Sequence, residues 1–318
     1  MNTAEQSQFN LLVHVARLYY LQRLTHQEIA NRLGLSRIKV TRLLQKAVDD
    51  GIVEFRIAEP LSQTFELEEE LRSRFHLKKA LVVSSGENAE QLLEHLGARA
   101  ADYLGALLEP GSVIGIGWGR TLEAVCRAAR KKKVVAPGST VVSLTGGMAA
   151  TTLQPNPYDV ATHLARAIGG TPRYLLLPAI VESARMRALL LDEPSSRQVT
   201  DLWEKLTVCL LSIGSISPQT GLFYSHPQPA RACDAVRKQG GVGDLLAQYF
   251  SADGTFLTTA FSDRTLAMDV TRLPGVALTI GVAGGAQKAD AILGALRSGC
   301  LNVVVTDETA ARRVLESP

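Results

Sequence analysis

The sequence has few cysteines and no long apolar segment. Four cysteines occur among 318 residues and none stands in a C-x-x-C pair, which argues against a zinc site or a disulfide framework. No apolar run approaches the roughly 20 residues that a membrane helix needs. The first ten residues lack the basic and apolar regions of a signal peptide. We therefore expect a cytoplasmic protein with reduced thiols that does not bind membranes.

Two further signals are missing. The six histidines are scattered along the chain, so we expect no metal site. The segment 115–120 begins as G-x-G-x-x but has Arg120 where the third glycine of a dinucleotide-binding loop would stand. We therefore expect no cofactor.

Positive charge is concentrated near the N-terminus. The formal net charge of the whole chain is only +3, which is too small for a general coat for nucleic acids. Between Arg23 and Lys46, however, six bases face a single acid, Glu28. Such a local concentration favours a polyanionic partner, although a solvated helix face can look the same.

The residues around this basic segment predict two helices. Apolar residues at helical spacing predict a first helix over 9–22. Thr25 can cap a second helix, and Glu28 three residues later completes a capping box. Gly34 ends that helix, because glycine accepts the left-handed conformation of a sharp turn.

A third helix is predicted over 36–50, with Ser36 as its N-cap and an alternating segment 52–57 as a small wing. Its apolar positions recur at the spacing of one buried face, namely Val40, Leu43, Leu44 and Ala47. A glycine turn between two short helices, the second of them basic, predicts a helix-turn-helix DNA-binding domain over residues 1–58. The alternative is a three-helix bundle used for dimerisation, or a winged helix that binds protein.

The second helix of this motif fits the major groove of double-stranded DNA. We expect Arg37, Lys39 and Thr41 to contact bases, and Arg42 and Lys46 to contact phosphates. The complete set of predicted DNA-binding residues is Thr25, Gln27, Ser36, Arg37, Lys39, Thr41, Arg42, Gln45 and Lys46.

After a charged connector, 58–76, with a helix over 62–75, strand and helix patterns alternate. The expected strands are 80–84, 112–118, 140–145, 173–178, 207–213, 276–282 and 302–306. The expected helices include 88–108, 119–130, 158–168, 287–298 and 308–316. This alternation predicts an α/β domain over 59–318 with a mostly parallel sheet.

Glycine-rich loops follow three of these strands, at 115–121, 144–147 and 281–288. Ligands of such sheets bind beyond the carboxyl ends of the strands, and the free N–H groups at a helix start suit a phosphate. A glycine there can also serve packing alone. The predicted effector-binding residues are Gly117, Gly119, Arg120, Thr121, Thr145, Gly146, Gly147, Asp244, Gly284, Gly285 and Lys288.

Three aspartates near turns, Asp159, Asp244 and Asp253, can accept hydrogen bonds from sugar hydroxyls. Each is equally well explained as a helix cap or turn residue. Asp244 follows two glycines and is the one we include in the predicted site.

A set of residues spread over nearly the whole chain matches one known family: Ala16 to Tyr20, Gln27 to Gly34, Ser36 to Leu44, Leu108 to Gly111, Gly117 to Thr121, Ser212 to Ser215, Gly243-Asp244, Ala283 to Gly285, Lys288, Ala291 to Leu296 and Thr306 to Ala310. On these residues the chain resembles the SorC family of sugar-responsive bacterial regulators. The resemblance implies an effector domain similar to phosphosugar isomerases, homotetramers on palindromic operators, and a phosphorylated sugar that changes DNA affinity.

Residue by residue, the resemblance places Gly119, Arg120, Thr121 and Lys288 at effector-phosphate positions. It places the loop of Thr145, Gly146 and Gly147 beside the ligand. The sugar-facing positions differ among members, so specificity does not carry over.

We therefore expect a regulator of a carbohydrate or polyol catabolic operon, controlled by a phosphorylated sugar or polyol. The alternative is a phosphosugar isomerase or deaminase fused to a DNA-binding domain. No carboxylate pair suited to isomerase chemistry stands out, so we expect a protein that is not an enzyme. A scaffold without a ligand fits the three glycine loops poorly.

Overall fold

The computed structural model describes residues 3–53, 59–148, 155–217 and 229–318. Internal contacts divide the chain into two units, Met1–Ser62 and Gln63–Pro318. Each unit has its own cluster of buried apolar side chains.

The first unit contains three helices. Helix α1 (Thr3–Ala16) continues into a π-helix, Arg17–Leu21, and is followed by α2 (His26–Leu33) and α3 (Arg37–Asp49). Their shared core includes Leu12, Val15, Leu18, Ile29, Val40 and Leu44. Of the predicted wing, residues 52–53 form a bend and residues 54–57 lie outside the described part of the chain.

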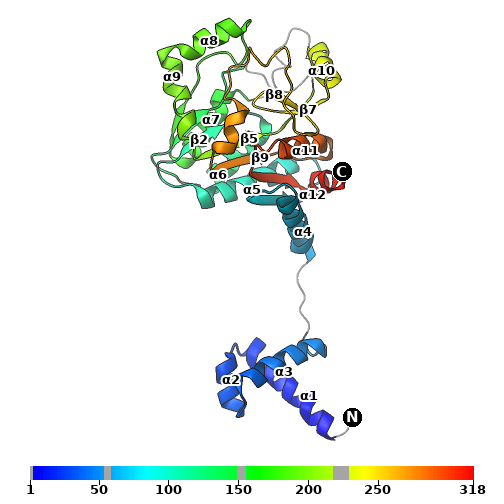
Figure 1. Cartoon of the computed structure of the whole chain (residues 1–318). Coiled ribbons are helices and arrows are strands. Elements are labelled where there is room, and N and C mark those ends of the chain that lie inside the picture. Colours follow the sequence, from blue (N-terminus) through cyan, green and yellow to red (C-terminus); the bar gives the residue numbers. More distant parts are fainter. Residues whose placement is uncertain (1–2, 54–58, 149–154, 218–228) are drawn as a thin grey trace. The chain divides into compact units, whose positions relative to one another are not determined.

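The second unit is built on a seven-stranded sheet with the order β1-β10-β9-β5-β2-β3-β4. Figure 1 labels β2, β5 and β9 of this sheet. All of its strand pairs are parallel. The strands are β1 (Lys79–Val83), β2 (Val113–Ile116), β3 (Thr140–Ser143), β4 (Thr171–Arg173), β5 (Val208–Ser212), β9 (Leu278–Val282) and β10 (Val303–Asp307). Valine-rich strands such as β10, buried at every position, are typical of a sheet that is covered on both faces.

Helices alternate with these strands. They are α4 (Glu59–Arg74), α5 (Ala89–Leu107), α6 (Arg120–Lys131), α7 (Pro157–Ile168), α8 (Ala184–Asp192), α9 (Pro194–Thr200), α10 (Pro229–Lys238), α11 (Ala289–Arg297) and α12 (Glu308–Glu316). Helix α6 packs between α5 and α7. Because parallel crossovers are right-handed, these three helices cover one face of the sheet and α11 covers the other.

A second, three-stranded sheet was not predicted from the sequence. It consists of β6 (Gly214–Ser215), β7 (Gly241–Leu245) and β8 (Gln248–Ser251), paired antiparallel. The turn between β7 and β8 is formed by Leu246 and Ala247, whose φ angles are 51° and 60°. Two-residue hairpins with positive φ normally use Asn or Gly, so the sequence carries no signal for this turn.

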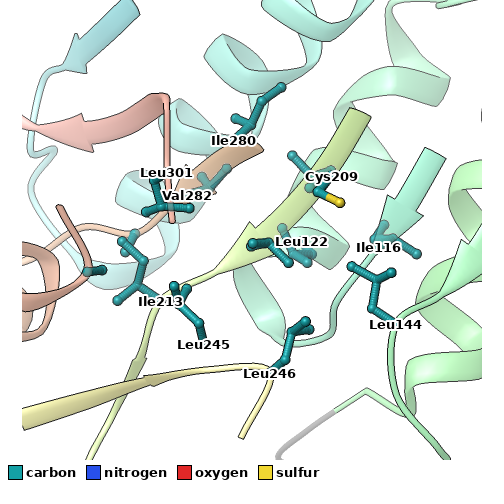
Figure 2. Packing of buried hydrophobic residues seen from close by; sticks show 14 of the residues in the cluster. Ile116, Leu122, Leu144, Cys209, Ile213, Leu245, Leu246, Ile280, Val282 and Leu301 are labelled. Carbon is teal, nitrogen blue, oxygen red and sulfur yellow. The ribbon is translucent and has the colours of Figure 1, made fainter. Parts of the chain in front are cut away.

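Leu246 of this turn is buried in the core of the second unit. Its side chain is 4% exposed, and Figure 2 shows it in one apolar cluster with Leu122, Leu144 and Ile116. Leu245 and Ile213 belong to the same core. The small sheet is thereby attached to the carboxyl ends of the large one.

The predicted fold class, a helix-turn-helix followed by a mostly parallel α/β domain, is confirmed. The predicted strand 173–178 is wrong, because β4 covers only Thr171–Arg173. Beyond β4 the carbonyls of Leu175 and Leu177 accept hydrogen bonds from the hydroxyl of Tyr158. Leu176 between them is 75% exposed, which a strand buried on both faces does not allow.

Candidate functional site

Local side-chain caps set the limits of the helix-turn-helix. The backbone N–H of Glu28 donates to the Thr25 hydroxyl at 3.3 Å, and the N–H of Thr25 donates to the Glu28 carboxylate at 2.8 Å. Helix α2 ends at Gly34, with a φ of 64°. The Ser36 hydroxyl then accepts from the N–H of Lys39 at 3.2 Å and begins α3. The capping box, the turn and the second cap predicted from the sequence are thus confirmed.

Helix α3 separates an apolar side from a polar one. Val40, Leu43, Leu44 and Ala47 are buried, whereas Arg37, Lys39, Thr41, Arg42, Gln45 and Lys46 are all exposed. Within the described residues, the side chains of Arg37, Lys39 and Arg42 have no hydrogen-bonding or ionic partner. These three cations are available to a polyanion.

The other predicted DNA-binding side chains have partners of their own. The Gln27 amide donates to Asn31 at 2.9 Å, Gln45 donates to Asp49 at 3.0 Å, and Lys46 pairs with Asp50 at 2.9 Å. The hydroxyl of Thr41 donates to the carbonyl of Arg37 and lies 3.1 Å from the ring of His26. Thr25 and Ser36 act as helix caps.

A pocket of about 380 Å³ opens in the second unit at the carboxyl ends of β2, β5 and β9. Strands β2 and β5 are neighbours, but the chain leaves them in opposite directions, toward β3 and toward β9. Open α/β sheets bind ligands at this kind of topological switch point. The position of the pocket therefore follows from the strand order.

The start of α6 forms one wall. Gly119, with a φ of 118°, begins the helix without a side-chain cap, and the first intrahelical bond runs from the N–H of Glu123 to the carbonyl of Gly119. The N–H groups of the first turn are thus free to bind an anion. Arg120 is exposed at this wall, and the adjoining Thr121 hydroxyl is nearly buried.

Lys288 approaches from the loop after β9. Its Nζ atom donates to the carbonyl of Ile213 at 2.9 Å, which leaves two N–H bonds for a ligand. Burial lowers the pKa of this amine to about 8, against the opposing effect of Asp244, and the charge of Arg120 lowers it further. Lys288 is therefore mostly cationic at neutral pH.

Asp244, at the end of β7, is the acidic group of the pocket. Its carboxylate accepts the N–H of Ala247 at 2.9 Å, so it also holds the β7–β8 turn. Burial raises the pKa of Asp244 to about 6, although the Ala247 bond and Lys288 act in the opposite direction. Gly214 lies so close that a Cβ there would sit 1.9 Å from the carboxylate.

The structure brings together six of the predicted effector-binding residues: Gly119, Arg120, Thr121, Asp244, Gly284 and Lys288. Gly117 does not line the pocket and is buried, with an added Cβ placed 3.5 Å from Leu246. The N–H of Gly285 is bonded to the buried carboxylate of Asp307 at 2.6 Å.

The loop of Thr145, Gly146 and Gly147 lies outside this pocket. Thr145 is fully buried, and the N–H groups of Gly146 and Gly147 donate to the carbonyls of Leu266 and Leu177. Gly147 instead lines a separate shallow hollow beside Tyr158.

Sequence reasoning missed the pocket residues at and just beyond the end of β5. Ser212, Gly214, Ser215 and Ser217 line the pocket, and the Ser212 hydroxyl donates to the carbonyl of Trp118 at 2.5 Å. Ser212 lies near the end of the predicted strand 207–213 and the other three follow it, so the strand-end rule that selected the glycine loops would have found them too.

All four cysteines are buried and unpaired. Within the described ranges, no cluster of three His, Cys, Asp or Glu side chains is suited to a metal ion. None of the helices described is long and apolar enough to cross a membrane.

Comparison with known proteins identifies the family. Residues 59–316 match the family described as "Putative sugar-binding domain", and residues 11–60 match the Crp-like helix-turn-helix domain. The chain is 32% identical over 313 residues to the erythritol catabolism regulatory protein EryD of Brucella abortus, with 97% of each chain covered. It is 28% identical over 309 residues to the deoxyribonucleoside regulator of Bacillus subtilis, covering 96% of this chain and 97% of the relative.

A solved structure agrees with both matches. The crystal structure of the full-length sorbitol operon regulator SorC from Klebsiella pneumoniae superposes with a TM-score of 0.72 at 26% identity, covering 97% of this chain and 99% of that one. The chain therefore belongs to the SorC family of transcriptional regulators, which join a helix-turn-helix to a sugar-binding domain.

Proposed function

We propose that this regulator binds operator DNA through α3 and is controlled by a phosphorylated sugar or polyol in the pocket at the β2, β5 and β9 strand ends. In this proposal residues 1–58 bind DNA, and residues 59–318 bind the effector and assemble the oligomer. The observation that carries it is the convergence of Arg120, Lys288 and the open start of α6 on one wall of the pocket.

The phosphate assignment rests on charge and on free donors. The first-turn N–H groups of α6 lie at the positive end of the helix dipole, and two cationic side chains line the same pocket. Lys288 uses only one of its N–H bonds, toward Ile213. A phosphoryl group has enough acceptor oxygens to engage all of these donors.

Other residues that line the pocket suit the hydroxyl groups and carbon chain of a sugar or polyol. The Asp244 carboxylate can accept hydrogen bonds from hydroxyls, whereas Leu92 and Leu96 of α5 offer apolar contact. The relatives' names refer to erythritol, deoxyribonucleosides and sorbitol, all of them polyhydroxyl compounds or derivatives of them. We therefore assign the chain to control of a carbohydrate or polyol catabolic operon.

Control requires that the effector bind one arrangement of subunits better than another. We propose a homo-oligomer, a tetramer by family resemblance, on a palindromic operator. Effector binding then shifts the population between arrangements that differ in the spacing of the α3 helices.

A thermal-shift screen tests the pocket. Phosphorylated sugars and polyols are each compared with their unphosphorylated forms, and a ligand at 100 times its Kd stabilises the folded state by about 2.7 kcal/mol. Lys288→Ala should abolish the shift, whereas Lys205→Ala, at an exposed lysine outside the pocket, should retain it. A ligand that stabilises the Lys288 variant as strongly as the parent would show that the site is misplaced.

Fluorescence anisotropy tests the DNA-binding role. Arg42→Ala should weaken binding to all duplexes and reduce the slope of log affinity against log salt by about 1. An unchanged slope and affinity would contradict the assigned role of Arg42.

One observation favours a second function. The pKa of Asp244, about 6, suits a general base at neutral pH, as an isomerase or deaminase would require. Asp244 is, however, the single carboxylate among the described residues lining the pocket. Turnover of ribose 5-phosphate or glucosamine 6-phosphate by the purified protein would establish this alternative. If neither compound is turned over, the regulator is the one function that remains.

A further inference from the structure

Ile38 is a large aliphatic residue exposed in the first turn of the recognition helix α3. It is 68% exposed and stands between the exposed cations Arg37 and Lys39. Exposed aliphatic residues are common singly and need no explanation by themselves. The position of Ile38 in the motif is what gives it meaning, because N-terminal residues of this helix reach base edges.

Helix geometry places Ile38 in the middle of the outward side. At 100° per residue, Ile38 falls opposite the buried positions of α3, of which Val40 and Leu43 are the nearest in sequence. It shares one ridge with Arg42 and Gln45, four and seven residues later, and both are exposed.

Polar side chains near Ile38 already have partners. The Ser36 hydroxyl caps α3 through the N–H of Lys39, and the Thr41 hydroxyl is bonded to the carbonyl of Arg37 and lies beside His26. What this turn still offers to bases is two cations and the methyl groups of Ile38. In the major groove, thymine is the base that displays an apolar group, its C5-methyl.

We propose that Ile38 contacts the C5-methyl group of a thymine in the major groove and thereby specifies thymine at one position of each operator half-site. The proposal rests on the DNA-binding role proposed above for α3. It makes Ile38 a determinant of sequence choice that contributes little to non-specific affinity, since that affinity comes from the cations.

The test removes the methyl group from the DNA rather than from the protein. The full-length chain first selects its operator from a pool of random duplexes. Each thymine of that operator is then replaced by deoxyuridine, which keeps the base pair and lacks the methyl group. Anisotropy should show roughly three- to fivefold weaker binding of the parent at one position per half-site, as expected for one buried methyl group.

Three variants attribute that effect to Ile38. Ile38→Ala should bind the thymine and deoxyuridine operators equally at that position. Leu21→Ala, which truncates an aliphatic side chain that is 72% exposed but lies outside α3, should keep the sensitivity of the parent. Ile38→Val, which retains two methyl groups, should fall between the parent and Ile38→Ala.

The outcomes separate this inference from the proposed function. A parent that binds its selected operator but tolerates deoxyuridine everywhere overturns the role of Ile38 and leaves DNA binding intact. The same conclusion follows if Ile38→Ala still binds the deoxyuridine operator more weakly than the thymine operator. A parent that enriches no sequence refutes specific DNA binding itself and the thymine contact with it.

Discussion

Replacing Asp244 with Asn removes a buried charge but keeps an oxygen for the N–H of Ala247. Burial raises the pKa of Asp244 from 3.8 to about 6 in the folded state. Because the folded-state value is the higher one, this carboxyl stabilises the fold fully below pH 3.8, and that contribution is lost as pH rises through 6. A pKa difference of about 2 corresponds to about 3 kcal/mol at neutral pH.

Urea unfolding of parent and variant between pH 4 and pH 8 measures this effect. The free energy of unfolding of Asp244→Asn minus that of the parent should be small at pH 4 and rise to about 3 kcal/mol by pH 8, while the other carboxylates cancel in the difference. Asp253→Asn is the control, because the Ser251 hydroxyl lowers the pKa of this exposed carboxyl and no such rise is expected. A difference that is flat with pH, or negative at pH 8, would refute the reasoning.

Three other predictions concern single contacts. The affinity of the parent for a phosphorylated effector, measured by calorimetry, should fall as pH rises through about 8, where Lys288 loses its charge. Lys288→Met should bind the effector weakly at every pH. Equal affinity of the parent at pH 7 and pH 9 would contradict this. Gly214→Ala places a Cβ 1.9 Å from the Asp244 carboxylate, so the free energy of unfolding in urea should fall by about 1–3 kcal/mol. An unchanged unfolding midpoint would show that the carboxylate can move away from the added Cβ. Thr25→Ala removes the capping box with Glu28 and should cost the N-terminal unit about 1 kcal/mol in thermal unfolding followed by circular dichroism; the argument for the cap fails if the melting curve does not move.

The helix-turn-helix could be predicted because its signals are local. Thr25 pairs with Glu28 and Ser36 with the N–H of Lys39, each three residues away, and Gly34 acts through its own backbone conformation. The parallel sheet could be predicted for a similar reason, since runs such as Val303 to Val305 favour strands buried on both faces.

The small antiparallel sheet could not be predicted in this way. Its turn at Leu246 and Ala247 depends on contacts with distant residues, such as the packing near Leu122. The same limit applies to the glycine loops. The sequence indicates that Gly146 and Gly147 lie at a strand end, but not that distant carbonyls occupy their N–H groups.

The residues that line the pocket come from both sheets. Arg120 and Lys288 follow strand ends of the large sheet and Ser212 ends its strand β5, whereas Asp244 and Ser215 belong to the small sheet. Side chains of the small sheet can therefore differ around a proposed effector while the strand ends that carry Arg120 and Lys288 stay the same. Under the proposed function, related chains can recognise different effectors on the same large sheet through changes in the small one.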